Sequence, residues 1–382
     1  MADQTTTALK QTERLAWLRL IRSENVGPII FRQLLARYGK AEAALAALPE
    51  LARRGGRRRP IRICTRAAAE DELASLDSLG ARLVALCEPD YPAALAAVED
   101  APPVIAMLGH PHLARLPAVA VVGARNASAN GRRLAESLAR DLAAAGYLVA
   151  SGLARGIDAA AHRGALDKAT AAVVAGGVDV VYPQENLELY EAIKAQGLII
   201  AELAPGTRPK ASHFPRRNRI ISGMALGTLV VEAAPRSGSL ITARFALEQG
   251  REVFAVPGSP LDPRARGCNG LIRQGAVLTE TAEDIVSALQ PLLRSPLSER
   301  RGGTYEGDLL ASGDEQDIAD ARETLMEMLG ASAITVDELI RQCQLSPATV
   351  TMALLELELA GCVERQPGNK VVLLLEPKSG GR

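Results

Sequence analysis

Short apolar runs alternate with amphipathic segments between Ala118 and Leu289. The runs predict strands at Ala118–Val122, Leu148–Ala150, Ala171–Val174, Leu198–Ala201, Thr228–Val231 and Val253–Val256. The intervening segments have helical periodicity and predict helices at Arg132–Ala145, Asp158–Leu166, Leu187–Ala195 and Leu240–Gln249. Nearly continuous apolar strands that alternate with helices are typical of a parallel sheet covered on both faces. The pattern therefore predicts an α/β fold with a central Rossmann-like parallel sheet domain.

The N-terminal region has a helical pattern of its own. Leu15, Leu18 and Ile21 recur at helical spacing, and Asn25-Val26-Gly27-Pro28 then interrupts the pattern before a second periodic segment. Two helices joined by a short glycine-containing turn fit a helix-hairpin-helix, in which turn amides hold a phosphate. A small helical bundle that only packs fits the same pattern equally well.

The C-terminal region has the pattern of a winged helix. Helices are predicted at Arg322–Leu329 and Thr335–Gln342, and Ser346-Pro347 supplies the N-cap and first residue of a third. Two short strands then flank Pro367-Gly368-Asn369 and predict a hairpin. We expect a helical domain over residues 1–90, a Rossmann-like domain over 91–291, a linker over 292–320 and a winged-helix domain over 321–376.

Composition narrows the class of protein. The 382 residues are 48% hydrophobic and 23% charged, as in globular chains. No apolar stretch reaches the roughly 18 residues of a membrane span, and the first residues lack the apolar core of a secretion signal. We therefore expect a cytoplasmic protein without membrane contact. The five cysteines form no CxxC pair and do not cluster with the four histidines, so we expect no metal site.

Charge is distributed in blocks, although lysine plus arginine and aspartate plus glutamate are equal at 44 each. Seven arginines and no acid lie between Arg53 and Arg66. The window between Glu202 and Glu232 has no carboxylate and five bases. From Asp320 to Glu376, nine acids stand against four bases. These blocks indicate three separate functional surfaces.

Three loops at the predicted carboxyl edge of the sheet are suited to anions, because each precedes a helix with free amides and a positive end. Their candidate residues are Arg125, Ser151, Gly152, Arg155, Ser237, Gly238 and Ser239. Arg125 stands where a dinucleotide fingerprint needs glycine, and no Walker lysine follows, so we expect no cofactor. Arg125 fits a phosphate contact or, alternatively, a structural salt bridge.

The carboxylate-free window contains bases around one of only four phenylalanines. An aromatic ring that stacks on bases, with cations on the phosphates, is typical of single-strand binding. The candidate contacts are Lys210, Phe214, Arg216, Arg217, Asn218 and Arg219. A buried Phe214 beneath a solvated basic loop is the alternative, which the absence of carboxylates disfavours.

Catalytic residues are not indicated anywhere in the chain. No nucleophile has a neighbouring base, and no G-x-S-x-G turn occurs. Asp158 fits a helix N-cap better than a catalytic acid. His162, one turn further along the same predicted helix, fits a packed and hydrogen-bonded histidine. We therefore expect a binding protein and no enzyme.

Several motifs taken together resemble one family. They are Gly123-Ala124-Arg125 with Ser128 and Gly131, the Ser151–Asp158 run, Tyr182-Pro183-Gln184-Glu185-Asn186, Phe214–Gly223, Ser237–Ala243 and Val256-Pro257-Gly258. Their order and spacing resemble the DNA-processing protein A (DprA, also Smf) family. The resemblance implies a homodimeric single-stranded DNA-binding protein of natural transformation, which protects incoming strands and loads the RecA recombinase. It carries DNA contacts onto Arg125, Lys210 and Phe214, with Arg217 and Arg219 as neighbours.

The third helix of the expected winged helix, Ser346–Ala360, has two acids and no base. A major-groove helix needs positive charge, so we expect a packing or protein-docking element instead. The alternative function is a nucleotide-cleaving phosphoribohydrolase-like enzyme, whose core is distantly similar. The order of glycine-rich loop, threonine and glutamate in that class is absent here, where Glu232 precedes the Ser-Gly-Ser loop.

Overall fold

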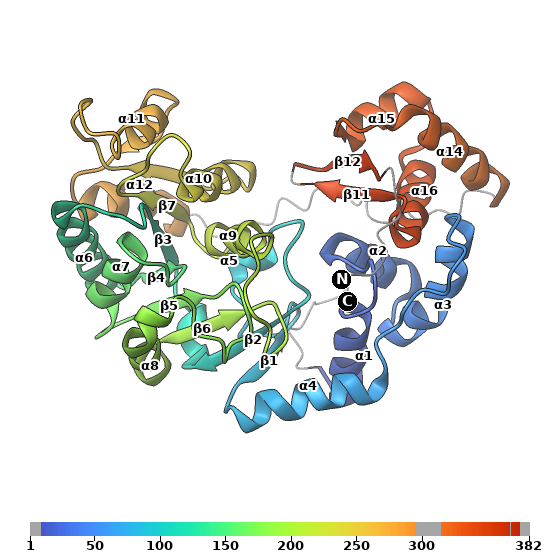
Figure 1. The fold of residues 1–382 in the computed structure, drawn as a ribbon, viewed down its shortest axis with the longest axis horizontal. Coiled ribbons are helices and arrows are strands. Elements are labelled where there is room, and N and C mark those ends of the chain that lie inside the picture. The colour runs from blue at the N-terminus through green and yellow to red at the C-terminus, as the bar shows by residue number, and fades with distance from the viewer. Residues whose placement is uncertain (1–8, 295–314, 367, 375–382) are drawn as a thin grey trace. The chain divides into compact units, whose positions relative to one another are not determined.

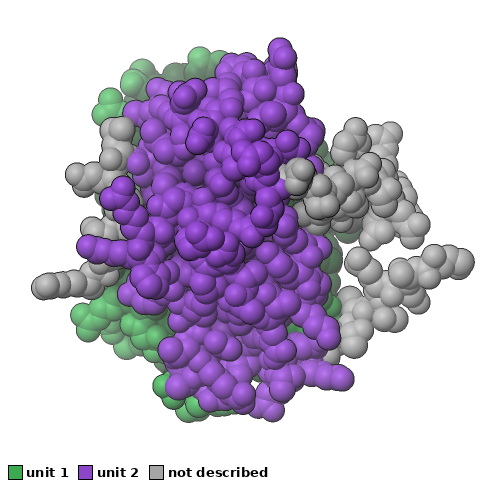
Figure 2. All heavy atoms as spheres, turned by 90° about the vertical axis from the view of Figure 1, so that its right-hand side faces the viewer, with its two compact units in different colours: residues 1–9, 71–296 green, residues 10–70, 297–382 purple. Residues whose placement is uncertain are grey.

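The computed structural model of the chain describes residues 9–294, 315–366 and 368–374. The described residues form two compact units, which Figure 2 distinguishes by colour: unit 1 holds Leu9 and residues 71–294, and unit 2 holds residues 10–70 and 315–374. Unit 1 therefore begins well before the expected boundary at residue 91. Of the expected linker, residues 295–314 lie outside the described residues, and the flanking residues belong to helices.

Unit 1 is built on a nine-stranded sheet in the order β1-β2-β6-β5-β4-β3-β7-β8-β9. The strands are β1 (Arg82–Ala85), β2 (Val104–Gly109), β3 (Ala118–Val122), β4 (Leu148–Ser151), β5 (Thr170–Val173), β6 (Leu198–Ala201), β7 (Gly227–Val230), β8 (Glu252–Ala255) and β9 (Val277–Leu278). All neighbours from β6 to β9 pair in parallel, whereas β1 and β2 add an antiparallel edge. This confirms the Rossmann-like sheet, and the pairing of β1 with β2 explains the earlier start of unit 1.

Helices cover both faces of this sheet (Figure 1). Val119 and Val121 of β3 point to one face, and Ala120 points to the other, because side chains alternate along a strand. The valine face packs against α6 (Ala129–Ala144), α7 (Ile157–Ala165) and α12 (Ala282–Arg294). The opposite face packs against α5 (Ala93–Ala96), α9 (His213–Gly223), α10 (Gly238–Glu248) and α11 (Arg266–Arg273). Helix α8 (Leu187–Gln196) lies beside β2 and β6.

The strand order reverses at β3. The chain passes from β3 to β4, β5 and β6 on one side and then crosses to β7 on the other. The loops after β3 and β7 therefore diverge at the carboxyl edge of the sheet, where open α/β sheets bind their ligands.

Unit 2 joins the two ends of the chain around one core. It contains α1 (Gln11–Ile21), α2 (Pro28–Tyr38), α3 (Ala41–Arg54), α14 (Glu315–Met328), α15 (Val336–Cys343) and α16 (Pro347–Ala360). A small sheet of β10 (Ile334–Thr335), β12 (Lys370–Leu373) and β11 (Val363–Gln366) completes the expected winged helix. Phe31 and Leu48 from the N-terminal helices and Leu325 and Leu354 from the winged helix belong to the same buried cluster. Helix α4 (Arg66–Ser78) contains the boundary between the units.

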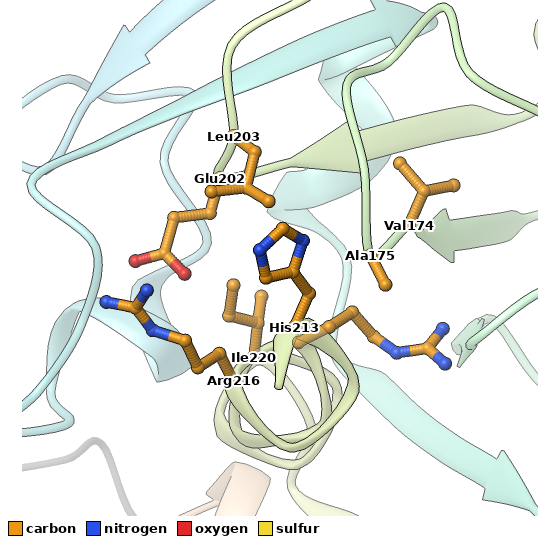
Figure 3. Close-up of a pocket in the computed structure, with 8 residues that line it drawn as sticks. Val174, Ala175, Glu202, Leu203, His213, Arg216 and Ile220 are labelled. Atoms are coloured by element: carbon orange, nitrogen blue, oxygen red, sulfur yellow. The ribbon is translucent and has the colours of Figure 1, made fainter. Parts of the chain in front are cut away.

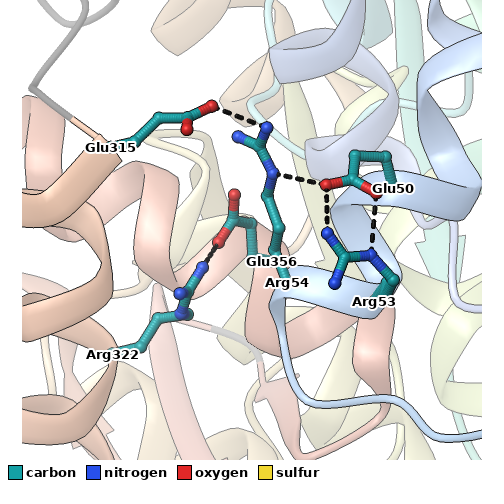
Figure 4. Close-up of polar contacts among 6 residues, drawn as sticks. All are labelled: Glu50, Arg53, Arg54, Glu315, Arg322 and Glu356. Carbon is teal, nitrogen blue, oxygen red and sulfur yellow. Dashed lines mark hydrogen bonds and ion pairs between the residues drawn. The ribbon is translucent and has the colours of Figure 1, made fainter.

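Helix α16, the third helix of the winged helix, is buried along most of its length. Eleven of its 14 residues are buried, because α14 covers it from its own domain and α3 from the N-terminal helices. A Cβ atom on Gly55, directly after α3, would clash with the backbone carbonyl of Glu356. The acids Glu356 and Glu358 are also buried, paired with Arg322 and Arg365 (Figure 4 for Glu356). Helix α16 is thus a packing element, as expected, but its acids are neutralised inside unit 2.

Among the residues that the structure describes, no helix is long and apolar enough to cross a membrane.

Candidate nucleic-acid interface

Two aromatic rings and a cation lie together at the carboxyl edge of the sheet in unit 1. The ring centroid of Phe214, on α9, is 5.7 Å from that of Tyr182, in the segment after β5. The guanidinium carbon of Arg125, after β3, is 5.3 Å from the Phe214 centroid. Tyr182 is 49% exposed, Arg125 is exposed and Phe214 is half-buried. This group, the Phe214 cluster, can stack on bases while its cation meets a phosphate.

Tyr182 is the member of the Phe214 cluster that sequence reasoning did not assign as a contact. It lies far from Phe214 in the sequence, and only the adjacency of β5 and β6 brings their following segments together. An aromatic residue directly after an apolar run was the available signal. The ring could equally have packed into the core.

Two small pockets lie at the start of α9, and Phe214 lines one of them. One is lined by Gly152, Val180, Tyr182, Pro209 and Phe214, with parts of the β5 edge and Arg217. The second pocket is shown in Figure 3, where the His213 ring projects from α9 between Glu202 and Leu203 on one side and Val174 and Ala175 on the other. Arg217 lines both pockets, and His213 and Arg216 line the second.

Arg217 is a buried structural residue and not a free cation. It is 6% exposed, and its guanidinium donates to the carbonyls of Gly152 and, at 2.7 Å, Val173. Burial lowers the pKa of Arg217 to about 10, although the neighbouring Asp158 carboxylate opposes this shift. These hydrogen bonds fasten α9 to the ends of β4 and β5, and the contact of Arg217 with DNA stays a prediction.

Arg219 has a similar internal role. It is 7% exposed and donates to the Glu202 carboxylate at 2.5 Å and to the backbone carbonyl of Asp100. The sequence predicted no helix over this window, whereas residues 213–223 form helix α9 with these two side chains buried. The contact of Arg219 with DNA stays a prediction, and this structure shows its guanidinium in internal hydrogen bonds.

Asp158 and His162 are buried beneath the interface. Asp158 lies in the first turn of α7, which has Gly156 as its N-cap, and accepts from the Ala154 amide at 3.3 Å. Burial raises the pKa of Asp158, against the attraction of Arg217 and hydrogen bonds from the loop amides. The Nδ1 atom of His162 lies 2.7 Å from the Thr170 hydroxyl, and burial lowers the pKa of His162 to about 3. His162 is the packed histidine that the sequence predicted, whereas Asp158 is not an N-cap.

The loop between β3 and α6 is already occupied by a carboxylate of the protein. Glu232, which follows β7, accepts from the Ser128 hydroxyl at 2.6 Å and from the Ser128 amide at 2.9 Å. Ser128 is the N-cap of α6 and also accepts from the Gly131 amide. The start of α6, which the sequence assigned to a phosphate, thus binds the Glu232 carboxylate of the protein itself. Asp158 does the same for the loop after β4, so two of the three expected anion sites are filled.

Several other predicted contacts are buried. Ser151 is fully buried and donates its hydroxyl to the Val121 carbonyl. Gly152 has no room for a side chain because a Cβ would meet the Arg217 guanidinium. Ser239 is buried with its hydroxyl 2.7 Å from that of Ser237. These three residues shape the loops but offer no side chain to a ligand.

The start of α10 remains open. Ser237 is the N-cap of this helix and is half-buried, and Gly238 is exposed with no atom within 4 Å of a Cβ position. The amide of the half-buried Asn218 side chain donates to the Gly238 carbonyl at 3.4 Å, which joins α9 to this loop. The amide of Ser237 donates to the Ala234 carbonyl at 2.9 Å and that of Ser239 to the Ser237 hydroxyl at 3.4 Å. The amide of Gly238 is therefore the group that the third predicted anion site still offers to a ligand among the described residues.

Three cations are exposed near the cluster. Lys210 and Arg216 flank Phe214 in the sequence, and the Arg216 side chain extends toward Glu202 in Figure 3. Arg155 is paired with Glu185 at 3.2 Å, both about half exposed, and such surface pairs contribute little. Within the described residues, Lys210 and Arg125 form no ion pair with a carboxylate.

The geometry defines a Rossmann-like protein whose sheet edge presents rings and cations instead of a nucleotide pocket. In the sequence, the sheet domain follows a helical hairpin domain and precedes a winged helix. The sequence profile of the family described as DNA recombination-mediator protein A matches residues 82–290. The profile of the DprA-like N-terminal HHH domain matches residues 11–75, and that of the DprA winged helix domain matches residues 311–369. The chain belongs to the DNA recombination-mediator protein A (DprA/Smf) family.

Curated relatives and solved structures agree with this assignment. Protein Smf of Escherichia coli is 38% identical over 311 residues, which cover 81% of this chain and 82% of that protein. The DNA processing protein DprA of Streptococcus pneumoniae is 43% identical over 202 residues, 52% of this chain and 71% of the relative. The X-ray structure of DprA from Streptococcus pneumoniae matches with a TM-score of 0.61 and 35% identity, covering 73% of this chain and 98% of that one. DNA processing protein A from Helicobacter pylori, whose structure is titled for its single-stranded DNA binding mode, matches with a TM-score of 0.51 and 26% identity, covering 55% and 96%.

Proposed function

We propose that this chain binds single-stranded DNA at the carboxyl edge of its sheet, and that in natural transformation it protects incoming strands and loads the RecA recombinase onto them. The Phe214 cluster carries the proposal. The centroid of the half-buried Phe214 ring lies 5.7 Å from that of the exposed Tyr182 ring and 5.3 Å from the guanidinium carbon of Arg125. The single-stranded DNA binding of the Helicobacter pylori relative, with its similar fold, supports it.

Single strands fit this surface better than duplexes. Every unpaired base has a face that a ring can cover, whereas the faces of paired bases are already stacked on one another. Arg125, Lys210 and the Gly238 amide at the start of α10 are suited to successive phosphates of such a strand. A strand on this edge would pass from the loop after β7 toward the segment after β5.

The remaining parts of the proposal follow from the family resemblance. They are a homodimer, a cytoplasmic location, the RecA recombinase as partner and the absence of a catalytic step. The alternative, a phosphoribohydrolase-like enzyme, would need a free carboxylate beside a nucleotide. Glu232, which follows β7 at this sheet edge, is engaged by Ser128 instead.

Fluorescence anisotropy with labelled single strands and duplexes over a salt series tests the binding. Single strands are expected to bind far more tightly. The affinity of Arg125→Ala should have a log–log salt slope smaller by about 0.7, because one phosphate contact is lost. The affinity of Phe214→Ala should fall by about 1–3 kcal/mol with the slope unchanged, because stacking releases no counterions.

Arg140→Ala is a matched control for Arg125, since Arg140 is an exposed arginine on α6 that is paired only with Glu136. Its affinity and slope should equal those of the unchanged protein. Equal affinity for duplexes and single strands, or an affinity that does not respond to salt, would contradict the proposal.

A further inference from the structure

Four arginines and no acid lie within residues 57–62, which we call the arginine segment. It belongs to unit 2 and follows α3, and it is part of the basic block that the sequence left without a function. The other arginines of that block are already paired. Arg53 and Arg54 form ion pairs with Glu50, and Arg54 also pairs with Glu315 (Figure 4). Arg66 pairs with Glu70.

The backbone of the arginine segment is held against the turn between α1 and α2. The Glu24 amide donates to the Arg62 carbonyl at 3.0 Å, and the Arg62 amide donates back to the Glu24 carboxylate at 3.1 Å. One residue pair further along, the Cys64 amide donates to the Ser23 hydroxyl at 3.1 Å. The segment is therefore fixed in position before any ligand arrives, which reduces the entropy lost on binding.

The charge of the segment is only partly neutralised. Glu24 forms an ion pair with Arg57 at 2.8 Å, and Arg57 also donates to the Arg59 carbonyl. Partial burial of Glu24 favours the protonated form of its carboxyl group. The Arg62 amide and the Arg57 guanidinium outweigh this effect and hold the pKa of Glu24 below its ordinary value, so Glu24 stays ionised and paired with Arg57. Arg58, Arg59 and Arg62 are exposed, and within the described residues their guanidinium groups donate no hydrogen bond and form no ion pair.

The winged helix does not offer an alternative DNA contact through its third helix. Helix α16 is covered by α3 and α14, and the side-chain amide of Asn25, at the α1–α2 turn, donates to the Leu359 carbonyl at its C-terminal end. A helix enclosed in this way cannot enter a major groove. The free cationic side chains of unit 2 that stand closest together in the sequence are those of the arginine segment.

We propose that the arginine segment is a second DNA-binding surface, in which Arg58, Arg59 and Arg62 bind phosphates of the backbone. Planar guanidinium groups suit phosphate oxygens, and three within five residues match the repeating charge of a strand. The segment has no aromatic residue, and its one isoleucine, Ile61, is buried. This surface therefore reads no bases, and it binds duplexes and single strands alike. It lies outside the Phe214 cluster and goes beyond the function proposed above.

The test uses the full chain with Arg58→Gln, Arg59→Gln and Arg62→Gln combined. Anisotropy titrations with an oligo-dT strand and with a duplex, each of about 60 nucleotides or base pairs, are compared over a salt series. Duplex binding is expected to weaken about tenfold or more, with a slope smaller by up to about 2.7. For the single strand the slope should fall by up to about 2.1.

A matched control removes three other exposed arginines, each paired with a glutamate on its own helix: Arg66, Arg140 and Arg244. This control has the same net charge as the variant of the arginine segment. If DNA contacts and not total charge set the salt dependence, its salt slope should equal that of the unchanged protein. Equal salt slopes for the two triple variants would overturn the proposal. An unchanged duplex affinity of the arginine-segment variant would also overturn it, and would favour an acidic protein surface as the partner of this segment.

Single substitutions separate this test from effects on folding and from binding at the Phe214 cluster. Arg58→Gln and Arg59→Gln alone remove exposed guanidinium groups that form no hydrogen bond or ion pair among the described residues, and each should reduce the duplex slope by about 0.9. Phe214→Ala should weaken single strands only. If Phe214→Ala has no effect while the arginine variants weaken binding, the Phe214 cluster fails and the arginine segment stands.

Discussion

Glu232 accepts two hydrogen bonds from Ser128, one from its hydroxyl at 2.6 Å and one from its amide at 2.9 Å. Ser128 caps α6 after β3, and Glu232 follows β7, so the pair bridges the two loops that diverge where the strand order reverses. In sheets of this type that crevice holds the phosphates of a nucleotide. Here a carboxylate of the chain takes the place of the phosphate, and the exposed rings lie further along the sheet edge.

Removing this carboxylate should open the anion site at the start of α6. Glu232→Ala is expected to lower the free energy of unfolding by about 1.5–3 kcal/mol, because hydrogen bonds to a charged group are lost. Inorganic phosphate should then raise the melting temperature of the variant but not that of the unchanged protein. Differential scanning calorimetry with a phosphate titration measures both effects. Glu248→Ala, which removes an exposed acid paired with Arg244, should respond to phosphate as the unchanged protein does.

Tyr182 should contribute to single-strand affinity through its ring. Tyr182→Ala is expected to weaken single-strand binding by about 1–3 kcal/mol without changing the salt slope. Tyr182→Phe keeps the ring beside Phe214 and should bind as the unchanged protein does. Anisotropy titrations distinguish the two variants. An equal loss in both would assign the contact to the hydroxyl and not to stacking.

A methyl group at Gly55 should separate α3 from α16. The Cβ of Gly55→Ala would clash with the Glu356 carbonyl, and overpacking of this kind lowers the free energy of unfolding by about 1–3 kcal/mol. Hydrogen exchange should show reduced protection in α3 and α16 and unchanged protection in β3 to β5. Gly330→Ala is the control, since no atom lies within 4 Å of its Cβ position. Equal loss of protection in both units would refute this localised effect.

His162 should make stability depend on pH. Burial lowers the pKa of His162 from 6.5 to about 3 in the folded protein. Between these values the unfolded chain binds the extra proton, so the free energy of unfolding falls as the pH decreases, by up to about 1.4 kcal/mol per pH unit. His162→Gln should lose this contribution, whereas His112→Gln, at an exposed position, should keep it. Urea unfolding between pH 4 and pH 7.5 gives the comparison, and parallel pH profiles for all three proteins would refute the assignment.

The sequence predicted the sheet well because its strands are buried on both faces. Each residue of β3 is buried, so the whole strand appears as one apolar run with clear ends. The antiparallel edge was not predicted, since β1 is a short strand at the margin of the sheet and lacks such a run.

Helix α9 shows where sequence reasoning about the site reached its limit. No helix was predicted over the window that contains Phe214-Pro215 and four bases, yet proline is tolerated in the first turn of a helix. The burial of Arg217 and Arg219 depends on acceptors from Gly152, Val173 and Asp100, which are distant in the sequence. Charged residues become buried only with such partners, and no local pattern reveals them.

The winged helix gives a related lesson. The two acids of α16 were interpreted as a surface that repels DNA, but Arg322 and Arg365 neutralise them inside unit 2. The conclusion that α16 does not bind DNA is retained for a different reason, which is its enclosure by α3 and α14.

The construction of unit 2 from both ends of the chain has a consequence during synthesis. The hydrogen bond between Asn25 and Leu359 spans 334 positions. At about 5–20 residues per second, the N-terminal helices leave the ribosome roughly 20–70 s before α16 exists. For that time the apolar surface that α16 later covers has no native partner. The last strand of the unit 1 sheet, β9, ends at Leu278, so this sheet is synthesised before α16. The nascent chain therefore presents a transient binding surface for a chaperone, and a stop codon before α16 would make that exposure permanent.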